Sequence, residues 1–169
     1  MYVAIGSSMP FQDLDDLLSD AQESPATGRR HPIVVIDDDA TIRDGLEFLL
    51  RSRYEVTVCA SAREGLSAIT QDTCAVILDV KMSKQDGFWA ATEIRKRFPD
   101  MPIIFYSAYQ NLRDPFGIIN EHRPFGYVAK GENVNKLVEV VDAAVRLQSL
   151  VISNRKLIES LKKNRRRAR

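Results

Sequence analysis

The stretch IVVIDDDA, residues 33–40, joins a buried strand to three acidic residues. Four consecutive aliphatic residues are typical of a strand that is covered on both faces, as in a parallel sheet. Asp37, Asp38 and Asp39 follow directly, and adjacent carboxylates repel each other and resist desolvation. We therefore expect a cation to offset this repulsion at the end of the strand.

Four more apolar runs follow and alternate with segments of helical periodicity. The predicted strands cover residues 33–36, 54–58, 75–78, 102–106 and 125–129. Apolar residues share a helical face in three of the intervening segments: Ile42, Leu46, Leu49 and Leu50 in the first, Leu66 and Ile69 in the second, and Trp89, Ile94 and Phe98 in the third. Strands that alternate with helices over short intervals predict right-handed βαβ crossovers and a doubly wound α/β sandwich.

Composition excludes several classes of protein. The chain has 169 residues, 44% of them hydrophobic, and a formal net charge of +1, so no overall field favours nucleic acid or membranes. No apolar run is long enough to span a bilayer, and the first residues do not resemble a secretory signal. Cys59 and Cys74 lack the spacing of a zinc site. We expect two buried free thiols in a cytoplasmic protein that does not insert into membranes.

The residues that follow the strands form a chemically consistent set. Ligands bind doubly wound sheets beyond the carboxyl ends of the strands. Asp37 and Asp38 follow the first strand, Asp79 the third, Ser107 the fourth and Lys130 the fifth. Clustered carboxylates suit Mg²⁺, whereas an ammonium and a hydroxyl suit the oxygens of a phosphoryl group. The central carboxylate, Asp79, is the candidate nucleophile that would form an acyl phosphate.

Four motifs resemble the receiver domain of bacterial two-component response regulators. They are IVVIDDDATIR (33–43), VILDVKMSKQDGF (76–88), FYSA (105–108) and GYVAKG (126–131), and the resemblance covers residues 32–147. It implies a flavodoxin-like fold with a five-stranded parallel sheet in the order 2-1-3-4-5. It also implies that a histidine kinase or phosphotransfer protein donates a phosphoryl group to one aspartate, with Mg²⁺ as cofactor.

The resemblance implies a role for each matching residue. Asp79 corresponds to the phosphoacceptor, and Ser107 and Lys130 to the residues that contact the phosphoryl group. The metal ligands are Asp37, Asp38, Asp79 and the backbone carbonyl of Lys81. Ser107 and Tyr127 correspond to the switch pair. Met82 and Gly87 fit the loop after the acceptor, while Asp39 lies outside the set and is expected to cap the next helix.

Three features depart from the family pattern. Ser83 stands where family members commonly have proline, and Gly131 follows Lys130 where they commonly have proline. The segment 108–124 contains Pro115 and Gly117, which interrupt a fourth helix. The side chain of Lys81 either approaches the phosphoryl site or is a solvated surface lysine.

Residues 1–31 form an acidic extension and linker ahead of the receiver domain. Residues 11–23 hold five acids and no base, and Phe11, Leu14, Leu17 and Leu18 share one helical stripe. A frayed tail, a helix that packs on its own domain and a docking helix for a partner all fit this pattern.

Residues 148–169 form a basic C-terminal extension. The helical pattern runs without Gly or Pro from residue 132 to residue 163. The apolar positions alternate at spacings of three and four: Val140, Ala143, Leu147, Leu150, Leu157 and Leu161, with Asn154 at a coiled-coil a position. This pattern predicts a parallel homodimer; the alternative is a long helix whose stripe packs back on the domain. Residues 162–169 hold six bases, but without a recognition fold we do not expect nucleic-acid binding.

The leading hypothesis is a phosphorylation switch that acts on a downstream protein target, and not an enzyme. A Mg²⁺-dependent phosphatase would need a second acid two residues after its nucleophile, a position that Lys81 occupies. A phosphorylation-independent interaction module and the receiver fragment of a longer regulator remain alternatives.

Overall fold

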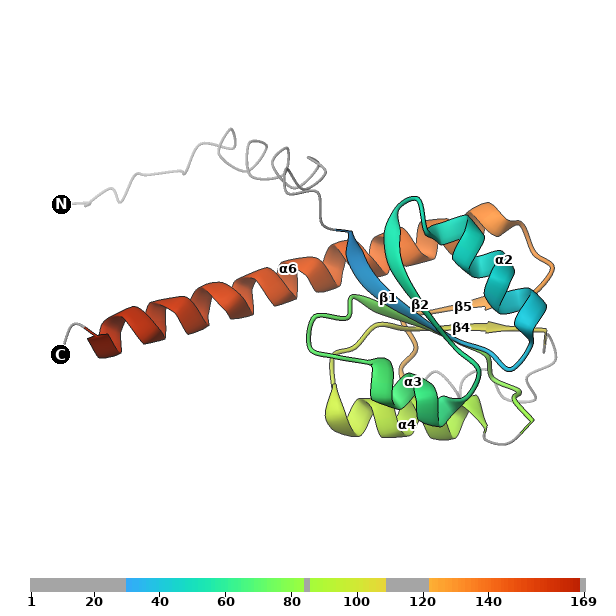
Figure 1. Cartoon of the computed structure of the whole chain (residues 1–169), viewed down its shortest axis with the longest axis horizontal. Coiled ribbons are helices and arrows are strands. Elements are labelled where there is room, and N and C mark those ends of the chain that lie inside the picture. Colours follow the sequence, from blue (N-terminus) through green and yellow to red (C-terminus); the bar gives the residue numbers. More distant parts are fainter. Residues whose placement is uncertain (1–29, 84–85, 109–121, 168–169) are drawn as a thin grey trace, which may run out of the picture.

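The computed structural model describes residues 30–83, 86–108 and 122–167, with side chains up to residue 163 (Figure 1). The predicted N-terminal helical stripe, most of the segment 108–124 and the last two residues lie outside these ranges.

Five parallel strands form one sheet. They are β1 (His31–Ile36), β2 (Tyr54–Cys59), β3 (Ala75–Leu78), β4 (Ile103–Ser107) and β5 (Gly126–Ala129). Their order is β2-β1-β3-β4-β5, and every neighbouring pair is parallel. This confirms the predicted flavodoxin-like sheet, and it places β2 at an edge.

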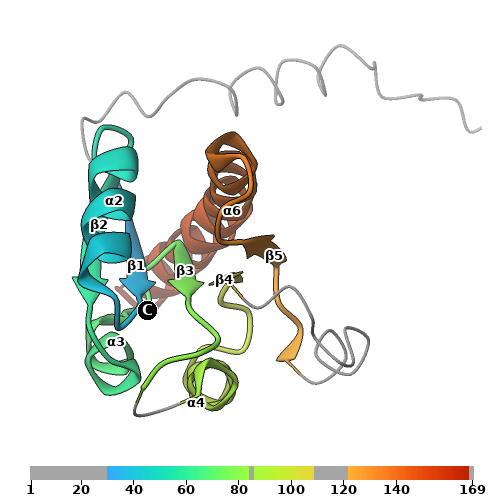
Figure 2. The same ribbon diagram turned by 90° about the vertical axis from the view of Figure 1, so that its right-hand side faces the viewer.

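Four described helices cover the two faces of the sheet. They are α2 (Ala40–Leu50), α3 (Ala62–Ala68), α4 (Gly87–Arg97) and α6 (Val134–Arg167). Figure 2 shows α2 and α6 over one face and α3 and α4 over the other. Successive side chains of a strand point to opposite faces, so Ile33 and Val35 pack in the core under α2 and α6, while Val34 and Ile36 pack under α3 and α4. The two cores explain why residues 33–36 of β1 are all aliphatic.

The predicted helical faces are confirmed for α2 and α3 but need a correction in α4. Leu46 and Leu50 are buried in the core, and Ile69 is buried beside a half-buried Leu66. On α4 the prediction that Trp89 shares the core face with Ile94 was wrong, because Trp89 is 43% exposed. The buried stripe instead uses Gly87, Ala90, Ala91 and Ile94. Small residues allow α4 to approach the sheet closely, and large apolar residues alone did not indicate this face.

The long helix α6 packs against the core as far as Ile152. Leu137, Val141, Val145 and Ile152 belong to the core, so helix packing continues beyond residue 147. Asp142 accepts a hydrogen bond from the Tyr54 hydroxyl and pairs with Arg53 at 2.8 Å.

The part of α6 from Leu147 onward carries most of the predicted coiled-coil stripe. Leu147, Leu150, Leu157 and Leu161 are 50–59% exposed, so this part of the stripe does not pack back on the domain, whereas Val140, its first residue, packs against the core. It lies on a different side of α6 from the buried residues. No helix in the described part of the chain is both long and apolar enough to cross a bilayer. Cys59 and Cys74 are buried free thiols, as predicted.

Candidate functional site

The strand register brings the predicted acidic residues together. Ile36 of β1 pairs with Leu78 of β3, and the next residue of each strand is an aspartate. The Asp79 backbone N–H donates to the Ile36 carbonyl at 2.9 Å, which fixes Asp79 beside Asp37. Asp37 and Asp79 are 1% and 5% exposed, so both carboxylates are desolvated at the edge of the sheet.

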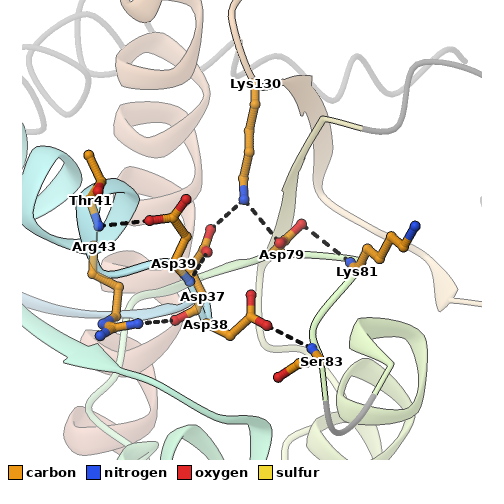
Figure 3. Close-up of polar contacts among 9 residues, drawn as sticks. All are labelled: Asp37, Asp38, Asp39, Thr41, Arg43, Asp79, Lys81, Ser83 and Lys130. Atoms are coloured by element: carbon orange, nitrogen blue, oxygen red, sulfur yellow. Dashed lines mark hydrogen bonds and ion pairs between the residues drawn. The ribbon is translucent and has the colours of Figure 1, made fainter.

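Lys130 reaches both buried aspartates from the end of β5. Its Nζ lies 2.7 Å from Asp37 Oδ2 and 2.9 Å from Asp79 Oδ2 (Figure 3). Burial opposes the charged ammonium, but its hydrogen bonds to the two carboxylates outweigh that effect and raise the pKa of Lys130. The ammonium is therefore firmly held in its charged form.

The three adjacent aspartates are each compensated differently. Asp37 Oδ1 accepts from the Asp39 backbone N–H at 3.0 Å, in addition to the Lys130 ion pair. Asp38 is exposed, and its carboxylate accepts from the Ser83 backbone N–H at 2.7 Å. Asp39 is the N-cap of α2, as predicted, and accepts from the Thr41 N–H.

Burial and hydrogen bonding move the pKa values of the first two aspartates in opposite directions. Burial raises the pKa of Asp37 despite its bond to Lys130. The backbone hydrogen bond from Ser83 lowers the pKa of Asp38. An added cation would therefore stabilise the ionised form of Asp37, whereas Asp38 is ionised without one.

The donor set fits a divalent cation. Asp37, Asp38 and Asp79 each offer an oxygen, and these atoms lie within 4.8 Å of one another. Mg²⁺ accepts a few carboxylate oxygens and keeps several waters, so a pocket with one exposed side suits it. Three carboxylates against one ammonium also leave a formal local charge of about −2, which a divalent ion offsets.

The loop after Asp79 is held close to the acceptor. The Lys81 N–H donates to Asp79 Oδ1 at 3.3 Å, whereas the exposed Lys81 side chain points away from the three carboxylates (Figure 3). A Cβ atom on Gly87 would lie 2.1 Å from the Asp79 backbone oxygen and 2.8 Å from Val80 Cα. Glycine at position 87 is therefore required for α4 to begin directly beneath the acceptor.

Ser107 and Tyr127 are coupled within the same edge of the sheet. Ser107 is 1% exposed and pairs in register with Ala129, so the next residue, Lys130, lies beside it. The Lys130 N–H donates to the Ser107 carbonyl at 2.9 Å. Burial raises the pKa of the half-buried Tyr127, and a side-chain hydrogen bond with Ser107 acts in the opposite direction. This bond is a direct contact between the two predicted switch residues.

Sequence reasoning missed two contacts that support the site. Arg43 Nη1 donates to the Asp37 carbonyl at 2.7 Å from the second turn of α2. Ser83 stands where family members commonly have proline, and its backbone N–H, which proline would lack, donates to the Asp38 carboxylate. The second departure also has a structural basis: Gly131 has φ +91°, a conformation that proline cannot adopt.

Comparison with known proteins agrees with this geometry. A family model described as the response regulator receiver domain matches residues 33–142. A protein-glutamate methylesterase/protein-glutamine glutaminase of Pyrococcus abyssi is 39% identical over 88 residues, which cover 50% of this chain and 24% of that protein. The transcriptional regulatory protein TdiR of Thauera aromatica is 31% identical over 127 residues, which cover 74% of this chain and 56% of TdiR. This chain therefore spans about a quarter of the first relative and just over half of the second.

A solved structure with the same fold is also similar in sequence. The response regulator protein TrrA of Thermotoga maritima, in complex with Mg²⁺-BeF, is 31% identical with a TM-score of 0.59. The match covers 67% of this chain and 97% of that chain. The family match extends over more than half of the residues and includes the aspartates, Ser107 and Lys130. This chain belongs to the response regulator receiver domain family.

Proposed function

We propose that the chain is a phosphorylation switch in which Asp79 accepts a phosphoryl group from a histidine kinase or phosphotransfer protein. The observation that carries this proposal is the single ammonium of Lys130, which contacts both Asp37 and Asp79 at the carboxyl edge of the sheet. Receiver domains as a family accept phosphoryl groups in signalling, and the family match includes these positions.

Phosphoryl transfer would form one bond and break one. An oxygen of Asp79 attacks phosphorus while the bond from phosphorus to the donor histidine nitrogen breaks, and the leaving imidazole retains that electron pair and takes up a proton. Lys130 then exchanges its contact with Asp79 Oδ2 for a phosphoryl oxygen. Asp37, Asp38, Asp79 and the Lys81 carbonyl would hold Mg²⁺, which supplies positive charge to the incoming phosphoryl oxygens.

The Ser107–Tyr127 hydrogen bond supports a route from the acceptor to the surface. A phosphoryl group adds charge and acceptor oxygens beside Asp79, and the buried Ser107 hydroxyl can turn to donate to them. Tyr127 then loses its partner or follows it, which changes the surface around β5. A downstream protein would read this shift in population.

We also propose that the chain forms a parallel homodimer through α6. The supporting observation is that the predicted stripe is exposed where α6 leaves the domain, with Leu147, Leu150, Leu157 and Leu161 each at least half exposed. The neighbouring positions Ser153 and Ser160 carry no charge, so like charges do not meet across a self-paired seam. Asn154 at a coiled-coil a position favours a two-helix coiled coil whose helices are in register.

A phosphodonor assay tests the switch. The full chain is incubated with Mg²⁺ and a small-molecule phosphodonor, and the acyl phosphate is measured by intact mass. We expect one adduct in the wild type and in the control variant Asp44→Asn, which alters an exposed aspartate of α2, but none in Asp79→Asn.

Each alternative function gives a different result. Absence of an adduct in the wild type would support a phosphorylation-independent module, and continuous turnover of phosphate esters would support a phosphatase. An adduct that persists in Asp79→Asn would show that another residue is the acceptor.

A further inference from the structure

The exposed apolar face of α6 is wider than a coiled-coil stripe. Val151 is 43% exposed and Ile158 is 51% exposed, and both lie next to the predicted stripe on the helix surface. We call the set Leu147, Leu150, Val151, Leu157, Ile158 and Leu161 the α6 apolar face. Exposed apolar surfaces of this kind on a polar-rimmed element mark interaction sites.

The C-terminal part of α6, which carries this face, is basic, and two of its bases, Arg155 and Lys162, lie beside the face on the helix surface. Between residues 153 and 163 the chain has four bases, Arg155, Lys156, Lys162 and Lys163, and a single acid, Glu159. Residues 164–169 add four more bases and no acid, so this end of the chain is strongly basic. A segment that is both apolar on one side and acidic is therefore the complementary occupant.

The chain itself contains such a segment. Residues 11–23, which we call the acidic segment, carry five acids, no base and one helical stripe of Phe11, Leu14, Leu17 and Leu18. This segment lies outside the described residues. Its charge is opposite to that of the C-terminal end of α6, and its apolar residues recur at the same helical spacing as those of the α6 apolar face.

The described structure brings the start of the domain beside α6. His31 Nδ1 at the start of β1 lies 3.7 Å from Cys74 Sγ, and Cys74 contacts the Asp72 carbonyl. Asp72 in turn forms an ion pair with Lys156 of α6 at 2.8 Å. Arg155 Nη2 also donates to the Gln71 carbonyl at 2.6 Å, which fixes α6 at the point where it leaves the domain.

The connection is long enough for the acidic segment to reach this face. Residues 24–30 span roughly 23–25 Å when extended, at about 3.3–3.6 Å per residue. The helix from residue 156 to residue 167 extends about 16 Å, at 1.5 Å per residue. The acidic segment is thus tethered within reach of the whole free end of α6, at a high effective concentration.

We propose that the acidic segment, residues 11–23, docks on the α6 apolar face of its own chain and competes there with a second copy. The competition rests on the homodimer proposed above, whereas the docking itself does not depend on it. Apolar contact with Leu157 and Leu161 provides the main attraction. The bases at the end of the helix, apart from Lys156, which already pairs with Asp72, select the acidic partner. The chain would dimerise fully only when the acidic segment is displaced.

Two measurements on the full-length chain test this proposal. In the first, the five acids of residues 11–23 are replaced by their amides, and dimerisation is measured by sedimentation over a range of concentrations. We expect the dimer dissociation constant to fall at least about tenfold relative to the wild type, because the competitor is weakened.

In the second measurement, a labelled peptide of residues 11–23 is titrated into the amide variant and followed by fluorescence anisotropy. We expect saturable binding that weakens as salt rises, because the charges are screened. Leu157→Asp should abolish binding without unfolding the domain, because Leu157 is 58% exposed. Ser160→Asp, which adds the same charge outside the apolar face, and a scrambled peptide of the same composition are the controls.

The outcomes separate this proposal from the homodimer. Absence of peptide binding, equal binding of the scrambled peptide, or binding that survives Leu157→Asp would overturn the docking. An unchanged dimer constant in the amide variant would overturn the competition. If the amide variant stays monomeric while the peptide binds, the homodimer proposal fails and the docking on α6 stands.

Discussion

The ammonium of Lys130 provides the sharpest test of how the acidic site is held together. Its Nζ contacts two carboxylates whose side chains are only 2% and 6% exposed, and the lysine side chain itself is 14% exposed. Lys130→Met keeps most of the aliphatic stem but leaves Asp37 and Asp79 buried side by side without a cation. A second ion pair, between Lys136 and Glu132, has the same 2.7 Å separation but side chains that are 53% and 39% exposed. Lys136→Met is therefore a matched control in which burial is the main difference.

The expected magnitudes follow from that difference in burial. Removal of one partner from a buried ion pair costs about 3–5 kcal/mol, because the remaining charge is desolvated and uncompensated. Loss of an exposed pair between residues four apart on a helix costs about 0.3–0.5 kcal/mol. With a typical urea dependence of about 2 kcal/mol per molar, Lys130→Met should lower the unfolding midpoint by roughly 2 M, and Lys136→Met by less than about 0.3 M.

Urea unfolding at neutral pH, with and without Mg²⁺, checks these values. A divalent cation at the three carboxylates offsets the repulsion that Lys130 otherwise offsets, so Mg²⁺ should recover more stability in Lys130→Met than in the wild type. The proposed site is wrong if Lys130→Met and Lys136→Met lower the unfolding midpoint by the same small amount and Mg²⁺ stabilises both variants and the wild type equally. In that case the Lys130 ammonium does not neutralise the buried aspartate pair.

Three further predictions concern Gly87, Asp37 and the two cysteines. Gly87→Ala should destabilise the fold by about 1–3 kcal/mol and slow adduct formation, because its Cβ would clash with backbone, whereas Gly45→Ala, with nothing within 4 Å of the new Cβ, should stabilise α2 by about 0.5–1 kcal/mol. Since burial raises the pKa of Asp37 above its ordinary value of 3.8, ionisation of this group opposes folding. Without Mg²⁺, the free energy of unfolding of the wild type, taken relative to that of Asp37→Asn, should therefore fall as the pH rises from 3.8 through the raised pKa. A wild-type stability that instead rises relative to Asp37→Asn over this range would contradict the burial effect. Because burial raises the pKa of both the Cys59 and the Cys74 thiols to about 11, alkylation at about pH 8 should be at least about 100-fold slower in the native protein than in urea. Rapid native labelling of either cysteine, measured by mass, would be inconsistent with a buried thiol.

Part of the site could be predicted from sequence because it depends on strand ends. A strand that is covered on both faces stays apolar until the chain leaves the sheet. Asp37 and Asp79 directly follow such strands, so they were expected at the carboxyl ends of β1 and β3. The prediction that Asp39 caps the next helix was confirmed for the same local reason. Ser107 and Lys130 were placed by the same rule, and the structure brings both to the edge of the sheet that holds the aspartates.

Other features could not be predicted because they depend on contacts between distant segments. Trp89 fits an apolar helical stripe, but only the closeness of α4 to the sheet selects the small residues Gly87, Ala90 and Ala91 for the buried face. The donation from Ser83 to Asp38 joins residues 45 positions apart. Sequence patterns contain no signal for such a backbone donor.

The amino-acid sequence by itself determined the alternation of strands and helices, the parallel sheet and the identity of the residues at its functional edge, since hydrophobic periodicity and strand ends are local properties. Tertiary structure decided which carboxylates share the Lys130 ammonium, because that depends on the register between β1, β3 and β5. It also decided that α6 buries one side against the sheet and leaves a second apolar side exposed. A helix with two apolar stripes can bury either one, and only packing against the β-sheet selects between them.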